Sequence, residues 1–311
     1  MSPHDIVIDA GQTGLRLGVA ARGAILTRAP ERAGPSYLDG GAADSVLRAV
    51  RAAASALPAS GGAVSTVCIG LATVLTSPGA YGELAATLRD DFGAARAMVT
   101  GDVVTAHAGA LTGRPGVVLA AGTGAIALGI TAAGRHRRVD GWGYLLGDAG
   151  GGSWIGRRGL DAAVRGHDGR MGAGALTASA EQTFGDLATL PERLYGAPDA
   201  VRQIAGFARS VLRLAAEGEP HATAIVAEAG TELARTAAAA AADFDPGDGV
   251  GVSWTGGLLA DAGLREAFLG GLSRLRPDAV PLPPAGDGLA GAALLAADPG
   301  GYTGLLQALV Q

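Results

Sequence analysis

The first half of the chain alternates short apolar runs with segments of helical periodicity. Asp5–Asp9 and Leu15–Ala20 are strand-like runs, and a glycine-containing turn at Ala10–Gly14 separates them. The same reading predicts, in chain order, a helix at Gly41–Leu57, a strand at Val64–Ala72, a helix at Tyr81–Phe92, a strand at Ala95–Thr100 and a helix at Val103–Leu111. Strands that alternate with helices are typical of α/β folds.

The opening pattern returns after Pro115. Val117–Ala121 predicts a strand, Gly122-Thr123-Gly124 a turn, and Ala125–Ile130 the returning strand. Residues 8–19 and 119–130 align with one deletion. We interpret this as a duplicated unit that carries one glycine-turn hairpin in each domain, with the boundary near Pro115.

The second half is rich in glycine over Gly141–Gly159 and then has helical periodicity from Leu160 to about Ala242. The later expected elements are a strand at Val250–Trp254, a helix at Leu258–Gly270, a short segment near Val280, and helices at Gly288–Ala297 and Tyr302–Val310. A chain of 311 residues is long enough for two domains, and the hairpins predict mixed β-sheets.

Composition excludes several mechanisms. All 24 basic residues are Arg, and the chain has no Lys, no Asn and a single Cys, Cys68. P-loop NTPases, protein kinases and pyridoxal enzymes depend on a Lys. Disulfides, iron–sulfur clusters and thiolate zinc sites need several Cys. Each of these classes is therefore excluded.

Net charge and hydropathy limit the kinds of partner that the chain is expected to bind. A net charge of −5 with 4% aromatic residues gives no basis for nucleic-acid binding. The long uncharged stretches Ala52–Gly82 and Gly116–Gly134 are interrupted by Gly or Pro, and the first residues have no signal-peptide pattern. We expect a cytoplasmic protein with no membrane partner.

Three glycine turns follow apolar strands, at Gly11–Gly14, Gly122–Gly124 and Gly256-Gly257. Glycine lets backbone N–H groups approach a phosphate, although a single such turn is usually an ordinary hairpin turn. The first two turns lie in hairpins and the third joins a strand to a helix. This order fits two loops that bind phosphates followed by one that binds a nucleoside. Asp9 and Asp102 follow strands and would supply a metal-associated acid and a base for phosphoryl transfer. The alternatives are an Asx turn for Asp9 and a helix N-cap for Asp102.

The segment Asp140–Gly156 contains seven glycines together with Trp142, Trp154 and Asp148. Proteins often hold a sugar ring by stacking its C–H face on an aromatic ring while a carboxylate binds the hydroxyls. The segment is therefore a candidate sugar site. The alternative is a structural loop that its Trp residues anchor.

Taken together, these motifs resemble the N-acetylglucosamine kinase branch (BadF/BadG-type ATPases) of the actin/hexokinase/Hsp70 superfamily. The resemblance runs from Asp9–Gly14 through Gly101-Asp102, Gly122–Gly124 and Gly141–Asp148 to Gly256-Gly257. It implies an α/β fold of two RNase-H-like domains with mixed sheets and an interdomain cleft. The implied domains are residues 1–113, residues 114–298 with a helical insertion, and a helix at 299–311 that packs back on the first domain.

The resemblance also implies roles. Asp102 would be the general base, and Asp9 would organise Mg²⁺ and ATP through water. The implied ATP-binding residues are Asp9, Gly11, Gln12, Thr13, Gly14, Gly122, Thr123, Gly256 and Gly257. The implied sugar-side residues are Asp102, Thr123, Gly124, Trp142 and Asp148. Because relatives often dimerise, a homodimer is compatible with the resemblance.

Several positions depart from the family pattern. The family's first loop usually reads Asp-Gly-Gly-Gly-Thr-Lys, but here Gln12 replaces the third Gly and Gly14 the Lys. In the segment that usually reads Gly-Asp-Glu-Gly-Ser, Ala149 and Gly151 replace Glu and Ser. The sugar-loop Asn of relatives is absent, and its expected replacements are Ser36, Tyr37 or Asp39. These departures leave the sugar open.

The resulting hypothesis is an ATP-dependent kinase for the 6-hydroxyl of an amino sugar, either N-acetylglucosamine or glucosamine. The alternatives are a kinase for N-acetylmuramic acid or another hexose, and a non-catalytic or ATPase-only sensor on the same scaffold. Dehydratase activators and Cys-rich zinc-loop sugar kinases both need more cysteines than Cys68. Among weaker candidates, His107 would polarise Asp102, or be an ordinary helix residue, and Arg135–Arg138 would contact phosphates, or be a solvated hairpin tip.

Overall fold

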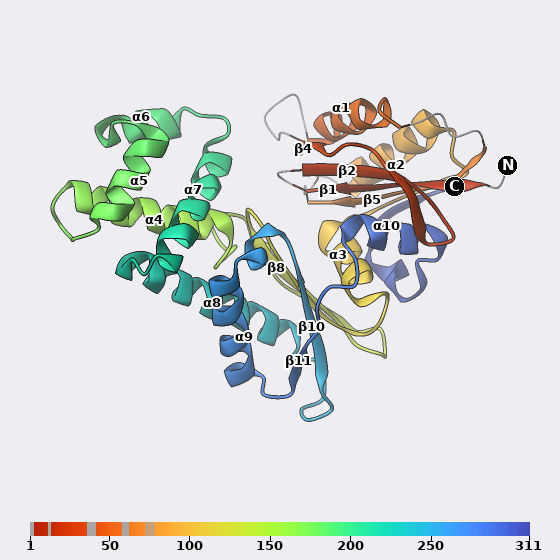
Figure 1. Ribbon diagram of the computed structural model, residues 1–311. Helices are drawn as coiled ribbons and strands as arrows, with labels where there is room; N and C mark the ends of the chain where they lie inside the picture. The colour runs from red at the N-terminus through yellow and green to blue at the C-terminus, as the bar shows by residue number, and fades with distance from the viewer. Residues whose placement is uncertain (1–2, 12–13, 36–41, 58–61, 73–74, 76–77) are drawn as a thin grey trace. The chain divides into compact units, whose positions relative to one another are not determined.

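The computed structural model describes the chain except residues 1–2, 12–13, 36–41, 58–61, 73–74 and 76–77 (Figure 1). The chain forms two compact units. The first unit consists of Met1–Val118, Ile130–Arg135 and Pro283–Gln311, and the second of Leu119–Gly129 and His136–Leu282.

The first sheet has the strand order β12-β6-β5-β1-β2-β3, and β4 also pairs with β2. Its strands are β1 (His4–Ala10), β2 (Gly14–Ala21), β3 (Ala24–Arg28), β4 (Arg32–Ala33), β5 (Val64–Leu71), β6 (Arg96–Gly101) and β12 (Leu306–Val310). Strand β1 is antiparallel to β2 but parallel to β5, and β5 is parallel to β6. All seven residues of β1 are buried, as expected for a central strand covered on both faces.

Two helices cover each face of this sheet (Figure 1). The helices are α1 (Ala42–Ala54), α2 (Pro78–Phe92), α3 (Asp102–Leu111) and α10 (Gly288–Ala297). Helices α3 and α10 approach closely because glycines lie at their crossing. A Cβ on Gly291 would lie 1.8 Å from the Thr105 carbonyl oxygen, and one on Gly109 would lie 2.0 Å from that of Asp287. No side chain fits at either position.

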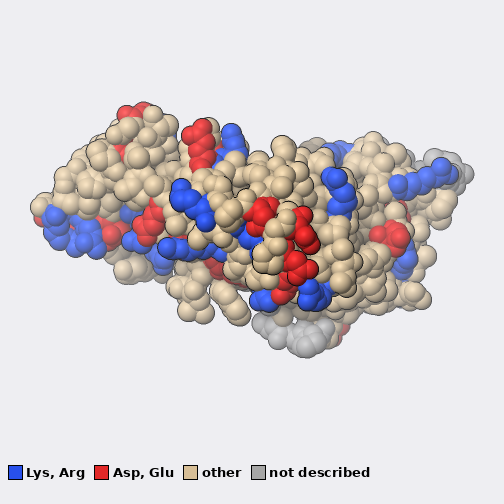
Figure 2. Space-filling view, turned by 90° about the horizontal axis from the view of Figure 1, so that it is seen from below, with Lys and Arg blue, Asp and Glu red and all other residues tan. Residues whose placement is uncertain are grey.

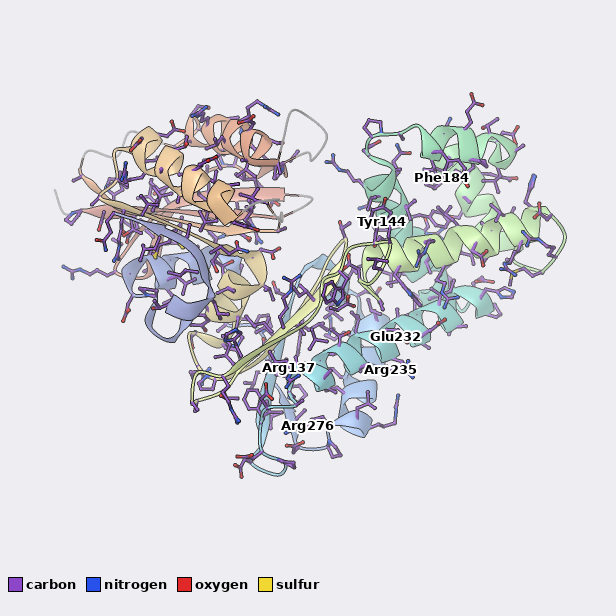
Figure 3. All side chains as sticks on the ribbon, turned by 180° about the vertical axis from the view of Figure 1, so that it is seen from behind. Arg137, Tyr144, Phe184, Glu232, Arg235 and Arg276 are labelled. Carbon is purple, nitrogen blue, oxygen red and sulfur yellow. The ribbon has the colours of Figure 1, made fainter. Side chains whose placement is uncertain are left out.

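The second sheet has the order β11-β10-β7-β8-β9, with β7 (Gly116–Ala121), β8 (Ala125–Ile130), β9 (His136–Asp140), β10 (Val250–Thr255) and β11 (Ala279–Pro281). Its helices are α4 (Gly152–His167), α5 (Gly174–Phe184), α6 (Leu190–Tyr195), α7 (Ala200–Ala216), α8 (Pro220–Ala240) and α9 (Ala262–Leu275). Arg276, labelled in Figure 3, follows α9 and donates to the carbonyls of Ala241 and Phe244 at 2.9 and 3.1 Å. This arginine therefore joins the end of α9 to the chain that leaves α8.

In the first sheet, β1 and β2 are antiparallel while β5 and β6 are parallel. In the second sheet, β10 and β11 are parallel, and β7 and β8 are neighbours joined by a hairpin turn. The predicted α/β class with mixed sheets is therefore confirmed. The two hairpins that the internal alignment predicts are also present. Strands β1 and β2 are neighbours around Gly11–Gly14, and β7 and β8 are neighbours around Gly122–Gly124. In each sheet, the hairpin's first strand also neighbours a strand that lies far later in the chain.

The C-terminal prediction was wrong. Residues 302–310 were expected to form a helix, but Gly300–Leu305 is a 3₁₀ turn and Leu306–Val310 is β12, antiparallel to β6. A short apolar run does not distinguish helix from strand, and here pairing with the edge of β6 decides the outcome. In the turn, Tyr302 Oη lies 2.8 Å from His107 Nδ1, and His107 Nε2 lies 3.1 Å from the Gly116 carbonyl oxygen.

Two further expectations differ from the structure. Residues 283–298 were assigned to the second domain but belong to the first unit, because α10 packs on α3 and on β1. The helix expected at Leu258–Gly270 is a 3₁₀ helix (Gly257–Ala260) followed by α9. The break lies at Asp261, whose carboxylate caps α9 by accepting from the Leu264 N–H at 2.9 Å. Strands β3 and β9 were not predicted.

The described helices include none that combines the length and the hydropathy needed to cross a bilayer. On the face shown in Figure 2, acidic and basic side chains lie interspersed among a larger uncharged surface. A nearly balanced count of 24 basic and 29 acidic residues is expected to give this mixed distribution.

Candidate functional site

The first glycine turn and Asp102 lie at the same edge of the first sheet. Ala10 is paired with Leu71, and Leu71 with Gly101, the residue before Asp102. Two strand spacings therefore separate the start of the turn from Gly101, a distance of about 10 Å. Within the turn, the Gly11 N–H donates to the Gly14 carbonyl at 3.0 Å. Because parallel β1, β5 and β6 all end here, this edge is where α/β sheets commonly bind ligands.

Asp102 is the first residue of α3 and is partly exposed. The prediction that it follows a strand and begins a helix is confirmed. The N-cap position itself belongs to Gly101, so the N-cap alternative for Asp102 was wrong. Gly70 on the neighbouring strand makes room for the start of the helix, since a Cβ there would lie 2.3 Å from Thr105 Oγ1.

Asp9 lies in a cluster of charged side chains. Its carboxylate forms an ion pair with Arg16, its cross-strand partner on β2. The other end of the Arg16 guanidinium lies 3.2 Å from Asp287 Oδ2, and Arg28 donates to the same oxygen at 2.7 Å. Asp287 also caps α10, because its Oδ1 accepts from the Ala290 N–H at 2.9 Å.

The two carboxylates of this cluster are perturbed in opposite directions. Burial raises the pKa of Asp9, and the nearby charge of Asp287 adds to this, while Arg16 opposes it. Burial also acts to raise the pKa of Asp287, but the hydrogen bonds from Arg28 and the Ala290 N–H hold it below its ordinary value. Arg16 therefore compensates a carboxylate that is only 6% exposed.

The second and third glycine turns come together in the second unit. The Gly122 N–H closes the second turn by donating to the Gly124 carbonyl at 2.9 Å. The first N–H groups of α4, from Gly152 and Ser153, donate to the carbonyls of Gly122 and Thr123, both at 2.8 Å. At the third turn, Gly256 has φ +93°, and a Cβ there would lie 2.1 Å from the Ala121 carbonyl oxygen.

Asp148, which was predicted on the sugar side, lies against the second turn. A Cβ on Gly124 would lie 2.4 Å from Asp148 Oδ2, so the carboxylate packs directly on the glycine backbone. The backbone N–H groups of Ala125 and Gly143 favour the ionised form of this carboxylate and so act to lower its pKa. Burial and the charge of Asp140 nevertheless raise the pKa of Asp148.

Trp142 does not anchor its loop in the core. Its side chain is 74% exposed, and Leu145 and Leu146 beside it are 72% and 85% exposed. Tyr144, labelled in Figure 3, lies on the same segment and is also exposed. Trp154, in contrast, lies in the first turn of α4 with Arg158 4.9 Å from the centre of its ring. The anchored-loop alternative therefore fails for Trp142.

Five predicted residues lie outside the described part of the chain: Gln12, Thr13, Ser36, Tyr37 and Asp39. Gly257, expected in the third turn, begins the short 3₁₀ helix, and a Cβ there would meet no atom within 4 Å.

The weaker candidates have structural partners. His107 contacts Tyr302 and Gly116 as described above, and burial lowers its pKa to about 4. Residues Arg135–Arg138 are exposed, as expected of a solvated hairpin tip, although Arg137 itself lies in β9 and pairs with Asp243 at 2.7 Å (Figure 3). Burial raises the pKa of Cys68 to about 12, as expected of an unreactive core thiol. In the described ranges, no group of three or more His, Cys, Asp or Glu residues is arranged to hold a metal ion.

Three residues of the site were not predicted: Arg16, Asp140 and Asp287. Asp140 accepts from the N–H groups of Asp148 and Ala149. Two of the three precede glycine, as Asp140-Gly141 and Asp287-Gly288, and the second pair stands before an apolar run in the manner of a helix N-cap. For Arg16, the available clue was a charged residue in the middle of an apolar strand.

Solved structures of several proteins assigned as sugar kinases are similar to this chain. A protein from Chromobacterium violaceum assigned as an N-acetylglucosamine kinase is 29% identical, and the match covers 94% of this chain and 99% of that one with a TM-score of 0.77. A protein from Porphyromonas gingivalis with the same assignment is 18% identical over the same shares, with a TM-score of 0.70. A Streptomyces griseus glucokinase of the ROK family is 23% identical, with a TM-score of 0.59. The last two likenesses show the fold alone.

A curated relative gives a shorter match. The N-acetylmuramic acid/N-acetylglucosamine kinase of Clostridium acetobutylicum is 38% identical over 73 residues, which is 24% of each chain. The family comparison is far more extensive, because the BadF/BadG/BcrA/BcrD ATPase family matches residues 8–296. The fold is that of sugar kinases of the actin/hexokinase type, and the chain belongs to the BadF/BadG/BcrA/BcrD ATPase family.

Proposed function

We propose that the protein is an ATP-dependent kinase that phosphorylates the 6-hydroxyl of an amino sugar. The observation that carries this proposal is the strand register that brings Asp102 to the same sheet edge as the first glycine turn. Phosphoryl transfer needs the phosphates and a hydroxyl-activating base to be positioned together. The full-length similarity to the Chromobacterium violaceum protein supports a sugar as the acceptor.

In this proposal, Asp102 takes the proton of the attacking hydroxyl. Its partly exposed place at the start of α3 leaves the carboxylate accessible to a substrate. Asp148 binds sugar hydroxyls, supported by its fixed place on Gly124, and Trp142 offers an exposed aromatic face to the ring. Gly124, on which Asp148 packs, and the adjacent Thr123 supply backbone groups to the same sugar.

The glycine turns suit the phosphates and nucleoside of ATP. A Cβ on Gly122 or Gly257 would meet no atom within 4 Å, so the backbone there has open space in front of it. We assign Gly11, Gly14, Gly122 and Thr123 to the phosphates, and Gly256 with Gly257 to the nucleoside.

A magnesium ion bound with ATP would neutralise phosphate charge during transfer. The donor set suits an ion held through water rather than a direct protein cage. Asp9 is already paired with Arg16, and MgATP sites commonly use one or two carboxylates with several waters and the phosphates. We therefore assign Asp9 to a water-mediated contact.

The sugar is proposed to be N-acetylglucosamine or glucosamine. N-acetylmuramic acid is a second candidate, because the name of the Clostridium acetobutylicum relative includes it. The decisive assay measures ADP release with MgATP across glucosamine, N-acetylglucosamine, N-acetylmuramic acid, N-acetylmannosamine and glucose. Sugar-dependent release supports a kinase. ADP release without sugar dependence, or none at all, would favour a sensor or ATPase on the same scaffold.

The base assignment is tested with Asp102→Ala and Asp102→Asn. A positioned base contributes roughly 10²–10⁴-fold, so both variants should lose at least about 100-fold in kcat. Asp90→Asn on the exposed end of α2 is the matched control and should retain full activity. Retention of kcat within tenfold in Asp102→Ala, with normal ADP binding, would refute the role of Asp102.

A further inference from the structure

Asp140 closes the segment that carries Trp142 and Asp148. It is the last residue of β9 and has φ +62°, in the left-handed region. Its Oδ1 accepts from the Asp148 N–H at 2.8 Å, and its Oδ2 accepts from the Ala149 N–H at 3.2 Å. One carboxylate therefore joins the end of a strand to two consecutive N–H groups eight and nine residues later.

The close fit of this carboxylate depends on Gly147. A Cβ at that position would lie 2.3 Å from Asp140 Oδ1 and 2.9 Å from the Trp142 Cβ. The intervening chain turns at Gly143, whose carbonyl accepts from the Gly147 N–H at 2.8 Å. Leu145 and Leu146 between them are exposed, so apolar packing contributes little to holding this segment.

Asp148 needs such support because its own backbone is unfavourable. Its φ is +60°, in the left-handed region that non-glycine residues rarely adopt. The residue is only 5% exposed, and its carboxylate packs on the Gly124 backbone, where a Cβ would lie 2.4 Å from Asp148 Oδ2. The Asp140 contact fixes the main chain from which that carboxylate extends.

We propose that Asp140 is a positioning residue that holds Asp148 in the geometry that binds the sugar. This inference rests on the proposed sugar-binding role of Asp148. Without the two carboxylate oxygens, the N–H groups of Asp148 and Ala149 lose their partner, and the segment is no longer closed. A shift of about 1 Å in a positioning group can cost roughly 100-fold in rate or binding.

Two substitutions separate the carboxylate from the backbone conformation. Asp140→Asn tolerates a left-handed φ as well as Asp does but keeps only one acceptor oxygen. Asp140→Gly relaxes φ and removes both acceptors, so its backbone strain falls while the contact is lost. Arg137→Gln is the control, since it breaks the Arg137–Asp243 ion pair on the same strand without touching the segment.

The test measures KM for the sugar and for ATP separately, together with the sugar-induced shift in the thermal unfolding midpoint. We expect Asp140→Gly to raise the sugar KM roughly 10- to 100-fold, Asp140→Asn to raise it less, and Arg137→Gln to leave it unchanged. The ATP KM should stay within about twofold of wild type in all three. The sugar-induced midpoint shift should shrink in the same order.

The outcomes distinguish this inference from the proposed function. If the wild type shows no sugar-dependent ADP release with any sugar of the panel, the proposed function fails. If the wild type is active and both Asp140 variants keep the sugar KM within twofold, the positioning role fails while the kinase stands. An equal rise in the KM of both substrates would also overturn it, because a general structural defect would not select the sugar. If Asp140→Gly fails to fold, Asp140→Asn decides.

Discussion

Each unit holds a buried aspartate beside a glycine turn, but the two carboxylates are held by different chemistry. Asp9 in the first unit is compensated by the side chains of Arg16 and, beyond it, Asp287 and Arg28. Asp148 in the second unit packs on the backbone of Gly124, and the backbone N–H groups of Ala125 and Gly143 favour its ionised form. The backbone packing in the second unit depends on glycines that allow a close approach. The cluster around Asp9 in the first unit depends instead on charged side chains that compensate one another.

The largest effect should come from Gly256→Ala in the second unit, where the third glycine turn packs directly on the backbone of β7. Gly256 has φ +93°, and the new Cβ would lie 2.1 Å from the Ala121 carbonyl oxygen. Because the clash is with backbone, it cannot be relieved by a small side-chain movement. We expect the free energy of unfolding to fall by about 3 kcal/mol, measured by urea denaturation. The neighbouring Gly257→Ala has open space and should change stability by less than about 0.5 kcal/mol. Equal stability of the two variants would contradict the conclusion that the close backbone approach at Gly256 excludes a side chain.

A smaller loss of unfolding free energy should follow when the charged cluster around Asp9 is broken with Arg16→Gln. The substitution leaves the buried Asp9 carboxylate without its guanidinium, at a cost of roughly 1–3 kcal/mol in unfolding free energy. Arg28→Gln removes only the half-exposed pair with Asp287 and should cost less than about 1 kcal/mol. The double variant Asp9→Asn/Arg16→Gln should be more stable than Arg16→Gln alone, because the uncompensated charge is gone. A double variant that is less stable would show that charge compensation is not the reason.

The smallest expected effect is a shift in the pH dependence of the sugar KM. Burial, and then the charge of Asp140, raise the pKa of Asp148, so this carboxyl protonates at a higher pH than an ordinary aspartate as the solution is acidified. If the ionised form binds the sugar, the sugar KM should rise on acidification while the carboxyl titrates. Asp140→Asn removes the like charge, lowers the pKa of Asp148 and should move this rise to lower pH. The measurement is sugar KM against pH at saturating ATP, and an unmoved profile in the variant would contradict the coupling.

Much of the fold and part of the candidate site could be predicted from local sequence. The two hairpins follow from apolar runs interrupted by glycine, and Asp102 at a strand–helix junction follows from the change in periodicity. The resemblance to the kinase family, rather than local sequence, implied that Asp148 and Gly124 belong to one site, because the contact joins residues 24 positions apart.

The missed features depend on partners that are remote in sequence. Arg16 and Asp287 are 271 residues apart, and nothing near either one indicates the other. Strand β12 is a strand because β6 offers an edge, which the run Leu306–Val310 does not reveal. Asp140 lies in the segment proposed as a sugar site, but its positive φ and its contacts with the N–H groups of Asp148 and Ala149 could not be deduced from the spacing of that segment. Long-range pairing and backbone handedness, rather than composition, account for these errors.

The discontinuous first unit has a consequence for the order in which the protein is made. Helix α10, with Asp287 at its N-cap, and strand β12 lie in residues 283–311, which the ribosome adds only after the second unit has been synthesised. Until then, the nascent first unit lacks the helix that packs on α3 and the strand that covers the edge of β6. The second unit can therefore fold vectorially during translation, while the first must wait, with an open strand edge, for the last tenth of the chain.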